Sequence, residues 1–559
     1  MNHSPAIIIL GPSALACALR LQALYPQAEI HGRRGRVADV ERLYDDFGDS
    51  LRALYRAGTP LIVLCAAGIV IRSLAGVLGE KDSEPPVLAV AEDGSAVVPL
   101  LGGLAGVNRM AREIATALQV SAAITTSGEL RFGTCLLEPP AGYVLVDLEQ
   151  GKGFVSDLLG GQAVRIEGEA PWLAQAKLPL AEHAARVIHI GPHSRAANSA
   201  ELLIHPQQVA VWVEHAGPEL LGELQQALHA AGLAAQSLAC LLAAPQLMAN
   251  AELHAAAAQL QLPLRFIDDL HQLPPLHSQH ANLRLLLAAA PIDAATLGRP
   301  RGRLTVIGLG PGAAEFMVPA ARQALDEAQD LLGYETYIDM AGPLRPEQVR
   351  HCSDNREEMQ RARHAFELAA SGRRVVLVSS GDPGVFAMAA AVLEALHEST
   401  DAEWQRVDLH IFPGVSAALA TAAKAGAPLG HDFSLISLSD NLKPWAIIEK
   451  RLELAAAADL VMAFYNPISK ARPWQLGCAL DIVRQQRTPE TLVVLGRDIG
   501  RPGETLRNLT LGELSPDMVD MRTLVIIGSS QTCRFPRADG GEWVYTPRSY
   551  PQQLAGITV

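Results

Sequence analysis

Short apolar runs alternate with Ala- and Leu-rich amphipathic stretches along most of the chain. In the first 135 residues the apolar runs are AIIIL, PLIVLCAAGIVI (60–71) and PVLAVAED (86–93). Uninterrupted apolar runs separated by helical patterns are typical of strands that are buried on both faces of a parallel sheet. We therefore predict an α/β domain with a mostly parallel sheet over residues 1–135.

The pattern weakens after this domain and then returns. Residues 136–205 contain EPPAGY, GEAPW and IGPHSRAAN, so we expect a small irregular segment there. A strand at QVAVWVE (208–214) and an amphipathic helix over 219–233 ending at Gly232 predict a second α/β unit over 206–298. The stretch 273–303 favours a helix followed by a linker, and its Gly/Pro/Arg cluster at 298–303 is the sharpest predicted boundary.

Four apolar strands in the second half end in turns rich in glycine or proline. They are LTVIGLGPG (304–312), VVLVSSGDPGVFAM (375–388), IFPGVSAALATAAKAG (411–426) and LVMAFYNPISKAR (460–472). The carboxyl ends of such strands are where α/β sheets present ligand-binding groups. The first two runs match neither GxGxxG nor GxxxxGK[ST], so they predict neither a dinucleotide site nor a P-loop.

Composition and charge narrow the class of protein. A chain of 559 residues is too long for one core, so three or four domains are expected. The net charge of -13 argues against binding to nucleic acid or anionic lipid. Seven scattered cysteines without CxxC or Cys/His spacing predict no metal centre and fit a reducing, cytoplasmic location. The N-terminal sequence does not match a signal peptide, and no apolar run is long enough to span a bilayer.

The four turns, together with GAPLGHDFSLISLSDNLKPWAIIEKRL (426–452), resemble the tetrapyrrole methylase family. More narrowly, they are similar to the precorrin-3B C17-methyltransferases of cobalamin biosynthesis. The resemblance covers residues 302–550 and implies a first subdomain over 302–415 and a second over 416–550. It further implies S-adenosylmethionine held between them, a tetrapyrrole substrate, a homodimer, and methylation coupled to ring contraction. A methylase of the same fold that acts on another acceptor, such as protein or RNA, is the alternative.

The same resemblance implies a set of donor-binding positions. Carried over residue by residue, they are Pro311, Gly381, Asp382, Val385, Ser416, Ala417, Tyr465, Asn466 and Gly528. Glycines in such turns let main-chain groups approach a folded ligand closely. Taken alone, Asp382 fits a helix N-cap equally well.

Ring contraction needs proton movement, for which the family-like block offers three candidates. They are His431, Asp440 and Lys443. Alternatively, His431 is a surface or capping histidine, and Asp440 caps a helix that starts near Pro444. Cations that could bind substrate carboxylates, or simply be solvated, are Lys443, Lys470, Arg472 and Arg497.

The first half resembles the cobalt-precorrin-5A hydrolases at 68–103, at AAITTSGE (122–129) and over 208–270. The fold expected overall is therefore multidomain α/β, with hydrolase-like modules before a two-domain methylase. Gly103 stands where that family has a histidine, and Met248 stands at a lysine position. The remaining titratable groups of the best-matched segment are Lys81, Asp82, Glu92 and Asp93. Two alternatives stay open: a second activity that opens a lactone and releases acetaldehyde, or a non-catalytic tetrapyrrole-binding module.

Overall fold

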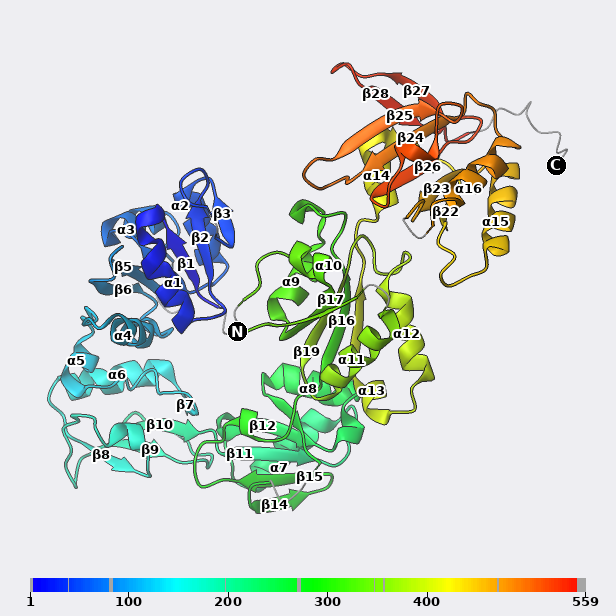
Figure 1. Ribbon diagram of the computed structural model, residues 1–559. Coiled ribbons are helices and arrows are strands. Elements are labelled where there is room, and N and C mark those ends of the chain that lie inside the picture. The colour runs from blue at the N-terminus through cyan, green and yellow to red at the C-terminus, as the bar shows by residue number, and fades with distance from the viewer. Residues whose placement is uncertain are drawn as a thin grey trace. The chain divides into compact units, whose positions relative to one another are not determined.

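The computed structural model describes residues 4–38, 40–79, 84–196, 198–268, 273–345, 347–354, 357–469 and 472–549. The chain divides into two compact units (Figure 1). The first is built from Met1–Arg301, and the second mainly from Gly302–Leu344 and Gln348–Val559. The division falls within the Gly/Pro/Arg segment at 298–303, and we describe each unit by itself.

A doubly wound sheet opens the first unit, with strand order β3-β2-β1-β4-β5-β6. All neighbours are parallel except β5 and β6. Its elements are β1 (Ala6–Ile9), α1 (Leu15–Leu24), β2 (Glu29–Arg33), β3 (Arg42–Tyr44), α2 (Phe47–Arg56), β4 (Leu61–Leu64), α3 (Ala67–Leu74), β5 (Val87–Val90), β6 (Val97–Leu101) and α4 (Val107–Leu118). Ile7 and Ile9 pack with α1 and α4, whereas Ala6 and Ile8 pack with α2 and α3. Burial on both faces explains the apolar runs, and the predicted mostly parallel sheet is confirmed.

The middle of the first unit is a small sheet rather than an irregular segment. Strand order is β7-β10-β9-β8. Its elements are α5 (Ser127–Phe132), β7 (Tyr143–Leu145), α6 (Leu148–Leu159), β8 (Val164–Glu167), β9 (Arg186–Ile190) and β10 (Glu201–Pro206). Phe132, Phe154 and Ile204 belong to its core. The expectation of irregular structure over 136–205 is wrong because strands of three to six residues are too short to show a period between proline- and glycine-containing loops.

A third sheet completes the first unit, with strand order β13-β12-β11-β15-β14. Its elements are β11 (Val209–Val213), α7 (Leu220–Ala230), β12 (Leu238–Ala243), α8 (Ala251–Leu260), β13 (Leu264–Phe266), β14 (Leu276–His280) and β15 (Leu283–Leu287). The helix expected within 273–303 is wrong, because β14 and β15 form an antiparallel hairpin there. Leucine favours helices, but pairing of β15 with β11 buries Leu283 and Leu285 in the core.

The first lobe of the second unit is an all-parallel sheet of order β18-β17-β19-β16-β20. Its elements are β16 (Arg303–Gly308), α9 (Pro319–Glu327), β17 (Asp330–Tyr334), α10 (Glu335–Met340), β18 (Val349–Ser353), α11 (Glu358–Ala370), β19 (Arg374–Ser379), α12 (Met388–Glu398), α13 (Ala402–Arg406) and β20 (Asp408–Phe412). Helices α11 and α12 pack on one face, and α9 and α10 on the other. The carboxyl ends of β16, β19 and β20 therefore meet at one edge.

The second lobe is a mixed sheet of order β22-β23-β26-β24-β25, joined by a small sheet of order β21-β28-β27. Its elements are α14 (Ala417–Ala425), β21 (Gly426–Ala427), β22 (Phe433–Ser437), α15 (Trp445–Ala457), β23 (Val461–Tyr465), α16 (Gln475–Arg484), β24 (Leu492–Arg497), β25 (Thr505–Thr510), β26 (Thr523–Ile527), β27 (Cys533–Pro536) and β28 (Glu542–Tyr545). Strand β26 runs antiparallel to both β23 and β24. The carboxyl ends of β23 and β24 therefore share one edge, and β26 ends at the other.

Short 3-10 turns occur at Pro12–Ala14, Pro171–Leu173, Ala235–Ser237, Pro245–Leu247, Ala294–Thr296, Ala314–Phe316 and Pro516–Met518. In the part of the chain that the structure describes, no helix has both the length and the apolar character needed to cross a membrane.

Candidate functional site

Three glycines touch one another where the first lobe's central strands end. A Cβ atom at Gly308 would lie 2.3 Å from the Gly381 carbonyl oxygen and 2.9 Å from the Gly414 Cα. A Cβ atom at Gly414 would lie 2.2 Å from the same oxygen. Gly381 has φ of 69°, and its N–H donates to the Gly310 carbonyl at 2.7 Å. We call Gly308, Gly381 and Gly414 the glycine junction, because Gly308 and Gly414 leave no space for a Cβ atom and Gly381 has a left-handed backbone that favours glycine.

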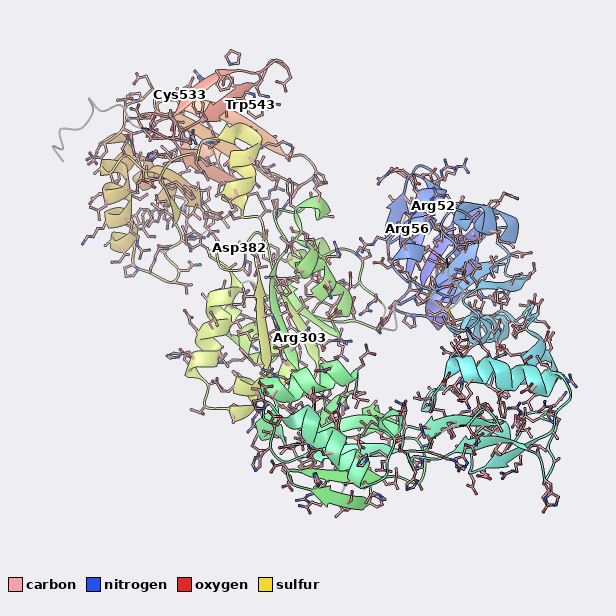
Figure 2. All side chains as sticks on the ribbon, turned by 180° about the vertical axis from the view of Figure 1, so that it is seen from behind. Arg52, Arg56, Arg303, Asp382, Cys533 and Trp543 are labelled. Atoms are coloured by element: carbon pink, nitrogen blue, oxygen red, sulfur yellow. The ribbon has the colours of Figure 1, made fainter. Side chains whose placement is uncertain are left out.

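The Asp382 carboxylate ties two of these turns together. Its Oδ1 accepts from the N–H of Gly384 at 2.8 Å, and its Oδ2 accepts from the N–H of Gly414 at 3.0 Å. The helix that follows, α12, has Ala387 as its N-cap residue. Asp382 is therefore a clamp between turns and not a helix cap. Figure 2 labels its position in the second unit.

Helix α14 brings the third and fourth turns to the same place. Ser416, only 3% exposed, caps this helix by accepting from the N–H of Leu419 at 3.4 Å. The Tyr465 hydroxyl accepts from the N–H of Ala418 at 3.0 Å. A Cβ atom at Gly381 would lie 3.7 Å from the Ser416 Cα and 3.9 Å from the Ala417 nitrogen. The structure thus brings together Gly381, Asp382, Ser416, Ala417 and Tyr465.

The causes of the pKa shift of the Tyr465 hydroxyl agree with these contacts. Burial raises the pKa of the Tyr465 hydroxyl, hydrogen bonds from Ser416 and Ala418 oppose the rise, and the Asp382 carboxylate adds to it. Tyr465 therefore remains neutral at physiological pH, with its oxygen free to accept the helix N–H.

Two residues with left-handed backbone flank Tyr465. Asn466 has φ of 51°, and its side-chain amide donates to the Ser437 hydroxyl at 3.1 Å. Phe386 has φ of 54°, is 50% exposed, and lies with its ring centroid 5.3 Å from that of Tyr465. Residues other than glycine rarely adopt this conformation, and they do so mainly at functional sites. Val385, next to Phe386, donates its N–H to the Asp382 carbonyl at 3.2 Å.

Two of the predicted proton-handling residues lie at this side of the second lobe. The Lys443 ammonium is 6.0 Å from the Phe386 ring centroid, and desolvation, followed by the charge of Arg451, lowers the pKa of Lys443. Asp440 accepts a hydrogen bond from the side-chain amide of Gln475 at 3.3 Å. Gln475 is 1% exposed and is the first residue of α16. Its hydrogen bond therefore fixes the position of Asp440 against the protein interior.

Arg501 joins the second lobe to the first and was missed by the sequence analysis. Its Nε donates to the Pro311 carbonyl at 2.7 Å, and its Nη2 donates to the Ser380 hydroxyl at 3.1 Å. A Cβ atom at Gly500, where φ is 79°, would lie 2.8 Å from the Pro311 Cγ. The available signal was an apolar run, TLVVLGR (491–497), followed by the glycine-containing turn DIGRPGE (498–504). This is the same pattern that located the other turns.

Gly528 does not lie with the other predicted donor-binding residues. It follows β26, whose residues Ile527 and Val525 pair with Met462 and Phe464 in antiparallel register. Gly528 is therefore beside the start of β23, whereas Tyr465 ends that strand. The expectation that Gly528 lines the same site is wrong because the direction of β26 could not be inferred from the sequence. Gly496, which pairs with Leu524, stands at the correct edge instead.

His431 is also separated from Asp440 and Lys443. His431 precedes strand β22, and Asp440 follows that strand. The length of β22, about 16 Å, therefore separates the two residues. The His431 Nδ1 accepts from the N–H of Asp432 at 2.8 Å, as a residue that stabilises a turn does. The structure therefore does not bring His431 together with Asp440, and the proton-handling roles of His431, Asp440 and Lys443 stay predictions.

The basic residues predicted to bind substrate carboxylates differ in their surroundings. Arg497 contacts the carboxylates of Asp520 and Asp498, each at 2.9 Å, so it is engaged within the protein. Arg472 exchanges backbone hydrogen bonds with Ser469. Lys470 lies outside the described residues. Lys443 is thus the predicted cation that the structure brings closest to Phe386 and Tyr465.

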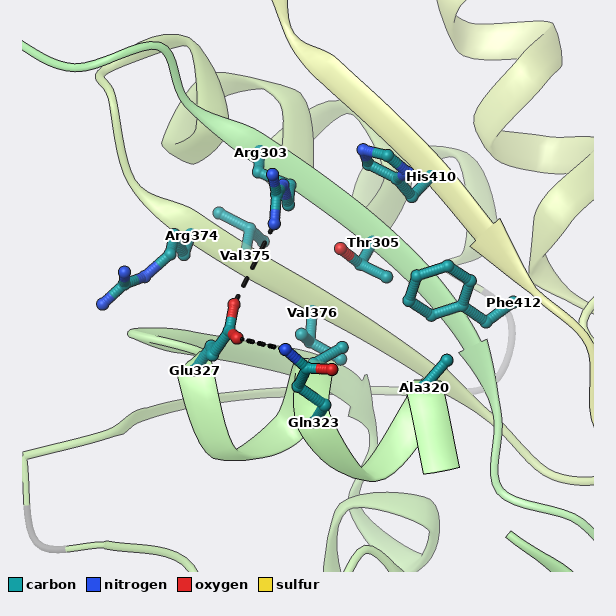
Figure 3. Close-up of a pocket in the computed structure, with 11 residues that line it drawn as sticks. Arg303, Thr305, Ala320, Gln323, Glu327, Arg374, Val375, Val376, His410 and Phe412 are labelled. Atoms are coloured by element: carbon teal, nitrogen blue, oxygen red, sulfur yellow. Dashed lines mark hydrogen bonds and ion pairs between the residues drawn. The ribbon is translucent and has the colours of Figure 1, made fainter. Parts of the chain in front are cut away.

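A cavity of about 120 Å³ lies in the first lobe, away from the glycine junction. Figure 3 shows Arg303, Gln323 and Glu327 around it, with Gln323 donating to Glu327 at 2.8 Å. Arg303 and Arg374 begin β16 and β19, so this cavity is near the amino ends of the strands. It does not belong to the site formed at their carboxyl ends.

In the first unit, the candidate carboxylates Glu92 and Glu129 accept hydrogen bonds from neighbouring side chains. Glu92 accepts from the Ser13 hydroxyl at 2.7 Å, and Asp93 lies in the hairpin turn between β5 and β6. Glu129, 6% exposed, accepts from Asn108 and Arg112. Around Gly103 a Cβ atom would meet no atom within 4 Å, and Met248 is buried in a core. Lys81 and Asp82 lie outside the described residues.

Among the described residues, no group of three or more His, Cys, Asp or Glu side chains is arranged to hold a metal.

Comparisons with known proteins define the class. Residues 303–515 match the model of the Tetrapyrrole (Corrin/Porphyrin) Methylases, and residues 49–129 match that of the Cobalamin synthesis G N-terminal domain. The chain belongs to the tetrapyrrole methylase family, whose members use S-adenosylmethionine, and it carries the second domain in addition. The resemblance of the second half to the methylases and that of residues 68–103 and 122–129 to the hydrolase family's N-terminal domain are thereby confirmed, whereas the resemblance of residues 208–270 stays a prediction.

Individual relatives narrow the class further. The chain is 53% identical over 249 residues to a Precorrin-3B C(17)-methyltransferase of Sinorhizobium sp, covering 44% of this chain and 97% of the relative. It is 48% identical over 263 residues to the cobalamin biosynthesis protein CobIJ of Mycobacterium tuberculosis, covering 46% of this chain and only 50% of that relative. The crystal structure of the methyltransferase CobJ is 49% identical with a TM-score of 0.42, and covers 44% of this chain and 100% of that one.

Proposed function

We propose that the second unit transfers a methyl group from S-adenosylmethionine to carbon 17 of precorrin-3B in cobalamin biosynthesis. The observation that carries this proposal is 53% identity across 97% of the Precorrin-3B C(17)-methyltransferase of Sinorhizobium sp. The glycine junction supports it independently. It brings turn backbones into close contact at the edge where the four turns converge, and residues without side chains there allow a folded donor to approach the main chain.

When bound, the donor supplies a methyl group on a sulfonium, and transfer breaks its S–CH₃ bond while an electron pair of the ring carbon forms the new C–CH₃ bond. The protein must align the reacting atoms and exclude water. Asp382 fixes the spacing of the second and third turns through its two backbone hydrogen bonds. Tyr465 and Phe386 present adjacent aromatic rings that cover one side of this edge.

We assign proton movement during ring contraction to Asp440 or Lys443. Lys443 is the stronger candidate for transfer, because desolvation lowers its pKa toward the range in which an amine exchanges protons. Gln475 keeps Asp440 in one orientation through its amide hydrogen bond. His431 is not included, because it lies at the opposite edge of the sheet.

The test is incubation of the full chain with precorrin-3B and S-adenosylmethionine carrying a labelled methyl group. We expect one labelled methyl at carbon 17, and its loss in Asp382→Ala. A protein that binds the donor but leaves precorrin-3B unlabelled would overturn the assignment. Label recovered on added RNA or protein would instead favour a methylase with another acceptor. The homodimer implied by the resemblance belongs to the same proposal, and light scattering of the full chain checks it.

A second candidate function concerns the first unit. The match of residues 49–129 to the Cobalamin synthesis G N-terminal domain favours a tetrapyrrole-related role. Gly103 and Met248 replace a potential acid–base group and a cation, so we propose binding rather than hydrolysis. Acetaldehyde release from a precorrin-5A-type substrate by the full chain would establish the hydrolase instead.

A further inference from the structure

The first sheet of the first unit has a topological switch point between β1 and β4. These strands are neighbours in the sheet. Helix α1, which follows β1, packs on one face, and helix α3, which follows β4, packs on the other. In doubly wound sheets with the order 3-2-1-4-5-6, ligands bind outside the carboxyl ends of the strands at this point.

Polar groups converge at this edge. Tyr44, only 6% exposed, donates its hydroxyl to the carbonyl of Ile9, the last residue of β1, at 2.7 Å. Arg33 ends β2, and Cys65 follows β4. Burial raises the pKa of Tyr44 to about 12, and the charges of Arg33 and Arg36 oppose this rise. Because β2 runs parallel to β1, Arg33 and the turn that carries Arg36 follow β2 at the same edge as the carboxyl end of β1.

Arg33 and Arg36 differ from the other basic residues nearby. Arg34 pairs with Asp45 at 2.8 Å, and Arg42 pairs with Glu29 at 3.0 Å. Within the described residues, neither Arg33 nor Arg36 has a carboxylate within ion-pair distance. The Arg36 N–H instead donates to the Arg33 carbonyl at 3.0 Å, in a turn where Gly35 has φ of 77°. One turn therefore presents two guanidinium groups that have no acidic partner among the residues that the structure describes, on a protein whose net charge is -13.

The neighbouring turns at this edge are small and exposed. A Cβ atom at Gly11 would meet only the Ser13 hydroxyl, at 3.9 Å, and one at Gly68 would meet only the Arg72 guanidinium, at 3.5 Å or more. Ala66 is exposed. Two described acids close to this edge already have partners, because Glu92 accepts from the Ser13 hydroxyl and Asp45 pairs with Arg34. Space and positive charge thus coincide beside the switch point.

We propose that this edge binds the carboxylate side chains of a tetrapyrrole, with Arg33 and Arg36 as the anion-binding residues. The ligand class rests on the proposed function, because the second unit acts on such a polycarboxylate. Guanidinium groups suit carboxylates because they donate two parallel hydrogen bonds to them. The turn after β1 reads LGPSA and lacks the GxGxxG spacing, which disfavours a dinucleotide as the occupant.

Arginine footprinting on the unmodified full chain gives the first test. Phenylglyoxal labelling is followed by mass spectrometry with and without uroporphyrin, a porphyrin that carries carboxylate side chains. We expect uroporphyrin to protect Arg33 and Arg36 at least fivefold while leaving Arg56 unprotected. Arg56, labelled in Figure 2, is exposed and ends α2 just before β4 begins, so it lies at the opposite edge of the same sheet. Equal labelling with and without uroporphyrin would overturn the proposal.

Variants provide the second test. In fluorescence titrations, the double variant Arg33→Gln/Arg36→Gln should lose one class of uroporphyrin sites or weaken it about tenfold, whereas Arg56→Gln should match the wild type. Methyl transfer to precorrin-3B should be unchanged in all three. Unaltered porphyrin binding in the double variant contradicts the proposal. Protection by AMP or inorganic phosphate, but not by uroporphyrin, assigns the edge to phosphate ligands and also contradicts it. Failure of methyl transfer with intact footprints overturns only the proposed function of the second unit.

Discussion

The first sheet of the first unit and the first lobe of the second unit both present the carboxyl ends of parallel strands at one edge, but they differ in strand order and in the residues at that edge. In the second unit, three backbones are in contact at Gly308, Gly381 and Gly414. The Asp382 carboxylate there accepts hydrogen bonds from backbone N–H groups. In the first unit, Arg33 and Arg36 extend from a turn beside small, exposed residues. Parallel topology therefore places a binding edge, while the residues at that edge decide between recognition by backbone and recognition by charge.

The largest effect should come from adding one methyl group to the glycine junction. In Gly414→Ala the new Cβ would lie 2.2 Å from the Gly381 carbonyl oxygen, so the turns must move apart. A displacement of about 1 Å is enough to lower a rate about 10²-fold. We expect donor affinity, measured by calorimetry, and methyl transfer to fall by about that factor.

Gly477→Ala is the matched control for Gly414→Ala. Gly477 lies within α16, where the nearest atom to a Cβ would be 4.0 Å away. Alanine should stabilise this helix by about 0.5–1 kcal/mol and leave donor binding unchanged. Normal donor affinity in Gly414→Ala would show that the junction does not shape the donor site.

The next largest effect should follow loss of the Asp382 clamp. Asp382→Ala leaves the N–H groups of Gly384 and Gly414 without their acceptor. Gly384 is exposed and Gly414 is half-buried, so each lost hydrogen bond costs about 0.5–1.5 kcal/mol and donor affinity should fall about 5- to 150-fold when both are lost. Asp382→Asn should recover part of the loss, because its oxygen can accept from one N–H while its amide nitrogen faces the other. Equal affinity for the Asn variant and the wild type would show that the second hydrogen bond is dispensable.

These two sites also show what the sequence could and could not predict. The strands and turns around Asp382, Ser416 and Tyr465 were predictable because an apolar run followed by glycine or proline is a local signal. The misplacement of Gly528 arose from the antiparallel direction of β26, which depends on pairing with β23 and β24. Arg501 contacts Pro311 across 190 residues, and no local pattern reports such a contact. The short strands of β7–β10 gave too weak a period to be recognised.

Arg501 offers a smaller effect confined to the second unit. Arg501→Gln removes the fork that reaches both the Pro311 carbonyl and the Ser380 hydroxyl. Because Arg501 is half-buried, its two hydrogen bonds should contribute at the low end of about 0.5–1.5 kcal/mol each, so we expect KM for the donor to rise about fivefold to tenfold with kcat nearly retained. Arg501→Lys should fall between the two, since an ammonium reaches one acceptor but lacks the planar fork. A fall in kcat without a change in KM would place Arg501 in the chemical step and would contradict a positioning role.

The smallest effect separates two tyrosines that end strands, the buried Tyr44 of β3 and the half-buried Tyr465 of β23. Tyr44 donates to the Ile9 carbonyl, whereas Tyr465 accepts from the Ala418 N–H, so ionisation breaks only the first hydrogen bond. Burial raises the pKa of Tyr44 to about 12, above its ordinary value of about 10. Its contribution to the stability of the first unit is therefore complete below about pH 10 and is lost as pH rises through 12. The tyrosinate absorbance that Tyr44→Phe removes should appear near pH 12 in the folded chain and near pH 10 in urea. A component of the folded protein that titrates near pH 10 and disappears in Tyr44→Phe would show that this hydroxyl is solvated, and the packing of the arginine turn against β1 would then need revision.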